Sequence, residues 1–140
     1  MNMIREIIHD TAMLSIPAEP ADESDIVVAD DLQDTLKANR EICVGLAANM
    51  IGVNKAIIVC VDTDTGEQFE MFNPVILKKS SAYEAEEGCL SLEGTRKTAR
   101  YHKILVQWDD RNMESHTRAF FNVTAQIILH ETDHCQGILI

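Results

Sequence analysis

The sequence predicts an α+β fold in a single domain over residues 1–140. Two observations lead to this prediction. Several short runs rich in β-branched and aromatic residues follow one another with turn signals between them, as in an antiparallel meander. One helical pattern precedes these runs and another follows them. A chain of 140 residues is also long enough to bury one hydrophobic core without disulfide bridges.

The first predicted helix covers about residues 22–42, after the turn-rich acidic segment PAEPADESD. That segment offers capping residues, and apolar side chains then recur at roughly helical spacing, at Ile26, Val27, Leu32, Leu36 and Ile42. The small residues of CVGLAANMIG predict a loop over residues 43–52. Residues 56–61 form an apolar, β-branched run that DTDTG ends, which predicts a short strand followed by a turn.

Four further strands and a second helix are predicted in the rest of the chain. The strands cover 68–79, about 81–86, 99–109 and 115–121, with a polar turn over residues 109–112. Asn122 or Thr124 caps the second helix, which runs through about Cys135, and Gly137 stands where a helix would stop. Residues 138–140 remain for a last short strand.

Composition excludes several classes of partner. The net charge of −11 would repel a phosphate backbone, and no Lys/Arg cluster opposes it, so we expect no nucleic-acid binding. No apolar run approaches the roughly 20 residues of a membrane span, and charged residues interrupt the N-terminal segment where a signal peptide would be apolar. We therefore predict a cytoplasmic protein that does not bind membranes, whose four cysteines are free thiols or metal ligands.

The segment His130–His134 is an H-E-x-x-H motif on the second predicted helix. Histidines four residues apart lie on one face of a helix, one turn from each other, so both imidazoles can bind one ion. Glu131 is then placed to exchange a proton with a water molecule at the ion. Two unrelated histidines on a helix surface are the alternative, but the apolar residues before His130 predict a buried helix, where unpartnered polar groups would be costly.

A third metal ligand is required, and the sequence limits the choice. The pattern H-E-x-x-H-x-x-G-x-x-H matches through Gly137 and fails at residue 140, which is Ile. The third ligand is therefore expected upstream, where Cys89 follows a glycine in the segment EGCLS. A thiolate with two imidazoles makes a three-ligand site with an open position. A lone buried cysteine is more often a small apolar residue than a ligand, and the place of Cys89 inside EGCLS favours the ligand.

Three segments resemble the motifs of the peptide deformylases, which are G-x-G-L-A-A-x-Q, E-G-C-L-S and H-E-x-D-H. This chain has GLAAN at residues 45–49, EGCLS at 87–91 and HETDH at 130–134, in the order of that family and with similar spacing. The last two motifs are intact, and the resemblance covers nearly the whole chain. It selects Cys89 as the third metal ligand.

The resemblance implies antiparallel β-sheets packed around a central helix that carries H-E-x-D-H. It also implies a metal-dependent hydrolase that removes the N-formyl group from the initiator methionine of new polypeptides. The cofactor would be one divalent metal ion, Fe(II) in cells, with Zn, Ni or Co in purified protein. The partners would be N-formylmethionyl peptides, with transient contact to the ribosome.

The resemblance also implies roles for individual residues. The metal ligands would be Cys89, His130 and His134, and the catalytic groups Glu131 and the backbone N–H of Leu90, which donates to the formyl oxygen. The peptide groove would be lined by Val44, Gly45, Met50 and Ile127. Asp133 is expected to support the site or pack the helix. Arg96 and Arg100 would meet the substrate or form structural ion pairs.

The first motif departs from the family at its end, because Met50 stands where the family has Gln. A thioether donates no hydrogen bond, so one donor to the developing oxyanion is missing. Asn49 is adjacent, but its side chain is expected to point elsewhere. This departure leaves two alternatives open, a hydrolase for another N-acyl or peptide substrate and a metal-containing binding protein with little turnover.

Overall fold

The computed structural model describes residues 3–139 of the chain. Five strands form one antiparallel sheet, and two α-helices of more than ten residues pack against it. In chain order the elements are α1 (Thr11–Leu14), η1 (Glu23–Asp25), α2 (Ile26–Ala38), β1 (Gly45–Ala47), η2 (Ala48–Ile51), β2 (Ile57–Val61), β3 (Gln68–Cys89), β4 (Leu92–Asp109), β5 (Ser115–Phe121) and α3 (Asn122–Cys135).

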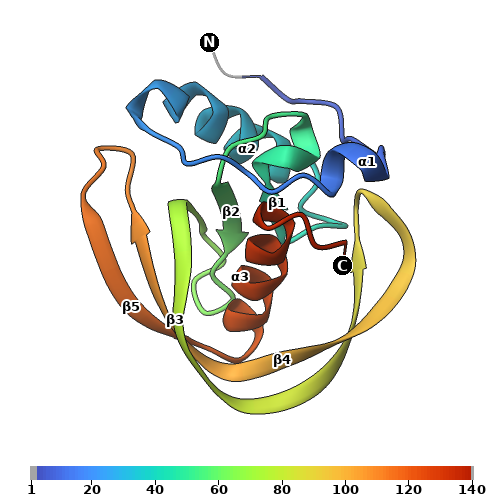
Figure 1. The fold of residues 1–140 in the computed structure, drawn as a ribbon, viewed down its shortest axis with the longest axis vertical. Coiled ribbons are helices and arrows are strands. Elements are labelled where there is room, and N and C mark those ends of the chain that lie inside the picture. Colours follow the sequence, from blue (N-terminus) through green and yellow to red (C-terminus); the bar gives the residue numbers. More distant parts are fainter. Residues whose placement is uncertain (1–2, 140) are drawn as a thin grey trace.

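The sheet has the strand order β1-β2-β3-β4-β5, so each strand pairs with the next along the chain. Its two long strands, β3 and β4, bend around α3, which lies inside the curve of the sheet (Figure 1). The α+β fold predicted from the sequence, with antiparallel strands around the motif-bearing helix, is confirmed. The wrapping is made by one continuous sheet.

Strand β3 joins two segments that the sequence separated. Residues 68–79 and 81–86 belong to one strand of 22 residues, Gln68–Cys89. Register shifts interrupt its pairing with β4 between Phe72 and Val75 and again between Ile76 and Lys78, and Asn73 and Ser81 have positive φ angles of 54° and 62°. Bulges and left-handed residues bend a strand without ending it, so these irregularities mark where the sheet curves.

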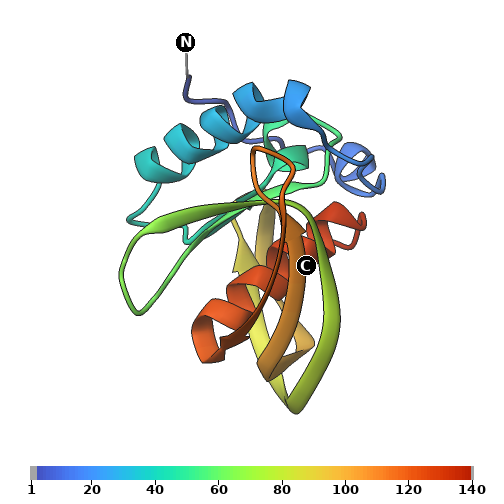
Figure 2. The same cartoon turned by 90° about the vertical axis from the view of Figure 1, so that its left-hand side faces the viewer.

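Helix α2 is shorter than the sequence predicted. It begins at Ile26, directly after a 3-10 turn in which Asp22 and Asp25 form a capping box. It ends at Ala38, with Asn39 as its C-cap. Leu32 and Leu36 are fully buried, whereas Ile42 is 72% exposed and lies beyond the helix. Figure 2 shows α2 above the sheet, on the side of the molecule away from the curved ends of β3 and β4.

Residues 43–52 do not form the predicted loop. They contain strand β1, whose Gly45 pairs with Cys60 of β2, and the 3-10 helix η2. Every residue of β1 is buried. The small side chains of this segment therefore allow close packing against α3. The prediction was wrong because a run of small residues is also typical of loops.

Helix α3 ends as predicted but is capped differently at its start. Its N-cap is Phe121, and neither Asn122 nor Thr124 caps it, because the Thr124 hydroxyl oxygen instead accepts the backbone N–H of Thr63 at 3.1 Å. Gly137 follows the helix with a φ of 76°, in the left-handed region that favours glycine. Residues 138–139 form no strand, and Ile140 lies outside the described residues.

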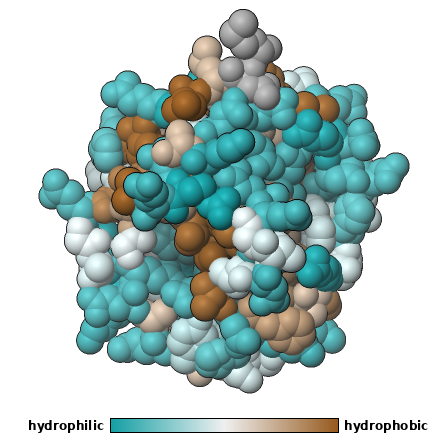
Figure 3. Space-filling view, turned by 180° about the vertical axis from the view of Figure 1, so that it is seen from behind, coloured by the Kyte–Doolittle hydropathy of each residue, from teal (hydrophilic) through white to brown (hydrophobic). Residues whose placement is uncertain are grey.

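On the face opposite the view of Figure 1, hydrophilic side chains cover most of the surface, and hydrophobic ones form a narrower band from the upper left of the view to its centre (Figure 3). Within residues 3–139, no helix has both the length and the apolar character that a membrane crossing requires.

Candidate metal centre

The two histidines of the H-E-x-x-H motif lie one turn apart on α3 and point the same way. Their Nε2 atoms are 3.2 Å apart, and both side chains are buried. The helix is buried on this side because Ala125, Ile128 and Leu129 pack into the core. Two imidazole nitrogens this close need a shared cation or proton, since their lone pairs would otherwise repel.

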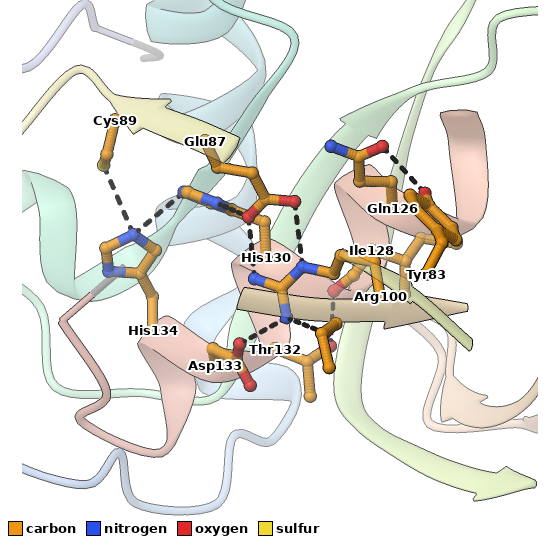
Figure 4. Close-up of polar contacts among 11 residues, drawn as sticks. Tyr83, Glu87, Cys89, Arg100, Gln126, Ile128, His130, Thr132, Asp133 and His134 are labelled. Atoms are coloured by element: carbon orange, nitrogen blue, oxygen red, sulfur yellow. Dashed lines mark hydrogen bonds and ion pairs between the residues drawn. The ribbon is translucent and has the colours of Figure 1, made fainter. Parts of the chain in front are cut away.

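Cys89 brings a third ligand atom from the end of β3. Its sulfur lies 3.3 Å from Nε2 of His134, and the ligand atoms of Cys89, His130 and His134 are all within 4.8 Å of one another (Figure 4). Metal–nitrogen bonds of about 2.0 Å and metal–sulfur bonds of about 2.3 Å in a tetrahedral site separate the ligand atoms by roughly 3.3–3.6 Å. The three residues therefore fit one metal ion, and among residues 3–139 they form the only such group.

A buried ionic network contacts His130 at Nδ1, the ring nitrogen that faces away from the other ligands. Nδ1 of His130 is 2.8 Å from a carboxylate oxygen of Glu87, which leaves Nε2 facing the other ligands. Arg100 donates to both oxygens of Glu87 at 2.9 and 2.7 Å and to Asp133 at 2.8 Å (Figure 4). A hydrogen bond to the second ring nitrogen fixes the orientation of a metal-binding histidine, so this network holds His130 in place.

The structure places three predicted residues outside the wall of the pocket. Arg100 forms buried ion pairs with Glu87 and with Asp133 of α3. Arg96 does not line the pocket either. Glu87 was not identified as a site residue from the sequence, although it precedes Cys89 by two positions. Residues i and i+2 of a strand face the same side, and this spacing was the available signal.

Burial and neighbouring charges shift the pKa values of the two histidines in opposite directions. Burial, together with the charge of the neighbouring His130, lowers the pKa of His134 to about 4. Burial alone would lower the pKa of His130, but Glu131, Cys89 and Glu87 outweigh burial and raise it to about 10. A metal ion and a proton compete for the same Nε2 lone pair, so metal binding releases this proton.

Glu131 is a buried carboxylate in direct contact with the pocket. Burial raises its pKa to about 7, although the charge of His130 acts in the opposite direction. Its Oε1 atom has no hydrogen-bond partner in the part of the chain that the structure describes. A base with a pKa near neutrality is suited to exchange protons in a reaction at neutral pH.

Gly45 of β1 leaves the space that Glu131 occupies. A Cβ atom on Gly45 would lie 2.8 Å from Oε2 of Glu131 and 2.9 Å from Cγ2 of Ile127. Both distances are shorter than side chains tolerate. Strand β1 can therefore approach α3 closely only with glycine at this position.

A pocket of about 540 Å³ opens beside these residues. The structure brings to its wall every substrate-binding residue predicted from the sequence, together with the predicted catalytic residues and two of the three metal ligands: Val44, Gly45, Met50, Ile127, Leu90, Glu131, Cys89 and His130. His134 lies beneath the pocket wall and is fully buried. The pocket also contains Gln126, which the sequence did not single out.

Met50 lines this pocket but is only 1% exposed, and its sulfur accepts the backbone N–H of Ala47 at 3.4 Å. The neighbouring Asn49 does not line the pocket, and its amide nitrogen donates to the carbonyl oxygen of His134 at 2.9 Å. Asn49 therefore points away from the reaction centre, and its amide is not available in place of the missing Gln.

Comparisons with known proteins agree over the whole chain. A family model described as polypeptide deformylase matches residues 4–140. The chain is 54% identical over 138 residues to the peptide deformylase of Clostridium beijerinckii, covering 99% of this chain and 100% of that relative. It is 37% identical over 127 residues to the peptide deformylase of Syntrophomonas wolfei, covering 89% and 80%.

Solved structures show the same fold. A peptide deformylase from Legionella pneumophila is 34% identical and superposes with a TM-score of 0.86, covering 97% of this chain and 83% of that one. The peptide deformylase from Thermotoga maritima is 27% identical with a TM-score of 0.85, covering 99% and 95%.

Proposed function

Because this chain belongs to the polypeptide deformylase family, we propose that Cys89, His130 and His134 hold one divalent metal ion and that Glu131 is its general acid/base. The chain is a peptide deformylase, a metal-dependent hydrolase that removes the N-formyl group from the N-terminal methionine of new polypeptides. The observation that supports the residue roles is the convergence of three ligand atoms beside a buried, unpartnered carboxylate in one pocket.

When bound, a divalent ion lowers the pKa of water and polarises a carbonyl oxygen. Glu131 accepts a proton from the attacking water and returns it to the amine that leaves, which a carboxyl group with a pKa near 7 can do in both directions. The backbone N–H of Leu90 donates to the formyl oxygen as negative charge develops on it. Formate and a peptide with a free N-terminus result.

Other residues of the pocket wall position the peptide. Val44, Gly45 and Ile127 give an apolar wall next to Glu131, against which the N-terminal residue of the substrate packs. Met50 lies where a side-chain donor to the oxyanion would be useful and provides none. We therefore expect a lower turnover than the same site would have with an amide at this position.

The native metal is proposed to be Fe(II), with Zn, Ni or Co able to replace it in purified protein. A set of one thiolate and two imidazoles accepts all of these ions, and selection in cells depends on supply. Metal analysis after anaerobic purification identifies the ion. We further propose a cytoplasmic location, where new polypeptides emerge, and transient contact with the ribosome, which stays a prediction.

The proposed function is tested by comparing two peptides on the iron-loaded protein, prepared without oxygen. Formyl-Met-Ala-Ser should release formate, and acetyl-Met-Ala-Ser should release little or no acetate. A chelator should abolish turnover, and added metal should restore it. Release of acetate at a comparable rate would favour an enzyme for other N-acyl groups. Tight binding of both peptides without turnover would favour a binding protein.

A further inference from the structure

Gln126 places an amide group in the wall of the pocket beside the metal centre. It precedes His130 by four residues on α3, so the two side chains lie on one face of the helix, about one turn apart. The other nearby side chains of this wall are apolar, namely Val44, Val123 and Ile127. An amide among apolar side chains needs a hydrogen-bond partner or water.

The oxygen of this amide already accepts a hydrogen bond. The hydroxyl of Tyr83 on β3 donates to Oε1 of Gln126 at 2.8 Å, and the Tyr83 ring stacks on His102 with 4.2 Å between ring centroids. The nitrogen of Gln126 therefore points away from Tyr83, as Figure 4 shows. Among residues 3–139 no hydrogen-bond acceptor is found for this nitrogen. Two fixed N–H donors thus remain for a ligand or for water in the pocket.

Among the described residues, none of the three carboxylates in the pocket wall accepts a hydrogen bond from this nitrogen, and Oε1 of Glu131 has no partner at all. Both oxygens of Glu87 are occupied by His130 and Arg100. Glu86 accepts the hydroxyl of Thr95. The donors of the half-buried Gln126 are therefore available to a ligand or to water in the pocket.

The position of Gln126 on α3 indicates which part of a bound substrate its amide can reach. A substrate whose formyl carbon lies beside His130 and Glu131 carries its first side chain within about one helical turn of that point. The side chain of methionine is four heavy atoms long and spans a comparable distance. Its thioether sulfur then lies near the amide of Gln126, but sulfur of this kind is a weak acceptor.

We propose that Gln126 makes this pocket accept an N-terminal side chain that carries a strong hydrogen-bond acceptor, so that peptides beginning with formyl-methionine sulfoxide are also substrates. Oxidation of methionine converts the thioether into a polar sulfoxide, whose oxygen accepts the N–H of Gln126. The sulfoxide takes no part in the hydrolysis and leaves unchanged in the product. This inference rests on the proposed function of the same site.

Norleucine is the matched side chain without an acceptor, because a methylene group replaces the sulfur. A site built to donate a hydrogen bond disfavours an analogue that cannot accept it, since the donor is then desolvated without a partner. The wild-type protein should therefore prefer acceptor-bearing side chains over norleucine.

The test compares kcat/KM for three peptides, formyl-Met-Ala-Ser, its sulfoxide and its norleucine analogue, in the wild-type protein and in Gln126→Leu. Leucine keeps a similar volume and removes both donors. We expect Gln126→Leu to lower the ratio of the sulfoxide to the norleucine peptide by about tenfold. The ratio of the methionine to the norleucine peptide should fall by less, because the thioether is the weaker acceptor.

A purely structural role of Gln126 gives a different result. If its only task is to tie α3 to β3 through Tyr83, Gln126→Leu lowers kcat/KM for all three peptides together and leaves their ratios unchanged. Tyr83→Phe is the second variant, because it frees the amide while keeping its donors. It should reduce the sulfoxide ratio less than Gln126→Leu does.

Failure of the inference can be told apart from failure of the proposed function. Formate release from the methionine peptide, with the sulfoxide ratio changed less than about twofold in Gln126→Leu, would overturn the inference alone. No formate from any peptide would refute the proposed function. In that event calorimetry with the unformylated peptides still decides, because the inference requires the same tenfold change in the ratio of their Kd values.

Discussion

Replacing Met50 with glutamine restores a side-chain donor in the pocket of this deformylase. Met50 is 1% exposed and lines the pocket, and its sulfur already accepts the backbone N–H of Ala47 at 3.4 Å. In Met50→Gln the amide oxygen can accept this N–H in place of the sulfur. The amide nitrogen is then left to donate into the pocket, at the side where the formyl oxygen develops charge.

The magnitude follows from what such a donor contributes elsewhere. Loss of one oxyanion donor typically lowers kcat about 100 to 1,000-fold, which is roughly 3 to 4 kcal/mol. The side-chain entropies that Met and Gln lose on burial are similar, so ordering the new side chain adds little cost. We expect Met50→Gln to raise kcat and kcat/KM together, by up to about 100-fold, with little change in KM.

Formate release from formyl-Met-Ala-Ser measures this effect, with metal content determined on the same samples. Met50→Leu is the control, because leucine fills the space but offers Ala47 no acceptor. It should lower stability by about 0.5–1.5 kcal/mol without raising turnover. Unchanged or reduced turnover in a well-folded, fully metallated Met50→Gln protein would refute the reasoning, since the missing donor would then not limit the rate.

Four further variants and one control variant test the site. Cys89→Ala should abolish stoichiometric metal binding in the presence of a competing chelator, and a full equivalent of bound metal would show that the third ligand is wrongly chosen. Glu131→Gln should keep the metal and lose about 100-fold or more in kcat, and more than a tenth of the wild-type rate would exclude it as the general base. Gly45→Ala should lower kcat strongly and stability by about 1–3 kcal/mol, because its Cβ would press on Glu131 at 2.8 Å, whereas Gly88→Ala, with 3.6 Å to its nearest neighbour, should be tolerated. Burial alone would raise the pKa of Glu87, but the hydrogen bonds from His130 and Arg100 lower it to about 2. The ionised Glu87 side chain therefore stabilises the fold above about pH 4.5, and this stabilisation is lost as the pH falls toward 2. The Tm difference between wild type and Glu87→Gln should shrink over that range, and a constant difference would contradict the pKa shift.

Local patterns in the sequence were sufficient for much of the fold. Strands β2 and β5, residues 99–109 of β4 and the helix that ends before Gly137 have clear apolar periodicity or clear stop signals, whereas the first part of β4, from Leu92, was not predicted. Strand β1 was missed because its small, buried residues have neither alternation nor β-branched bulk. The continuity of β3 was missed because the exposed, polar residues Ser80 and Ser81 interrupt the apolar pattern, and only pairing with β4 maintains the strand there.

The candidate site divides in the same way. The motif on α3 is local, since four-residue spacing on a helix is visible in the sequence. The roles of Glu87, Arg100 and Gln126 depend on how β3 and β4 curve around α3, and these contacts join residues 13 to 43 positions apart. No single segment of the sequence contains that information.

The reaction centre is built at the tip of a hairpin. Cys89 ends β3, Leu92 opens β4 opposite it, and only Leu90 and Ser91 connect them. This two-residue connection places Cys89 directly opposite Leu92, so one inserted residue there would displace the thiol and the Leu90 N–H at once. The turn at residues 62–67 is longer, lies away from the pocket and is largely exposed. Length changes, affinity tags or inserted domains are therefore better accommodated at this turn than at the hairpin tip, where an inserted residue would move the reaction centre.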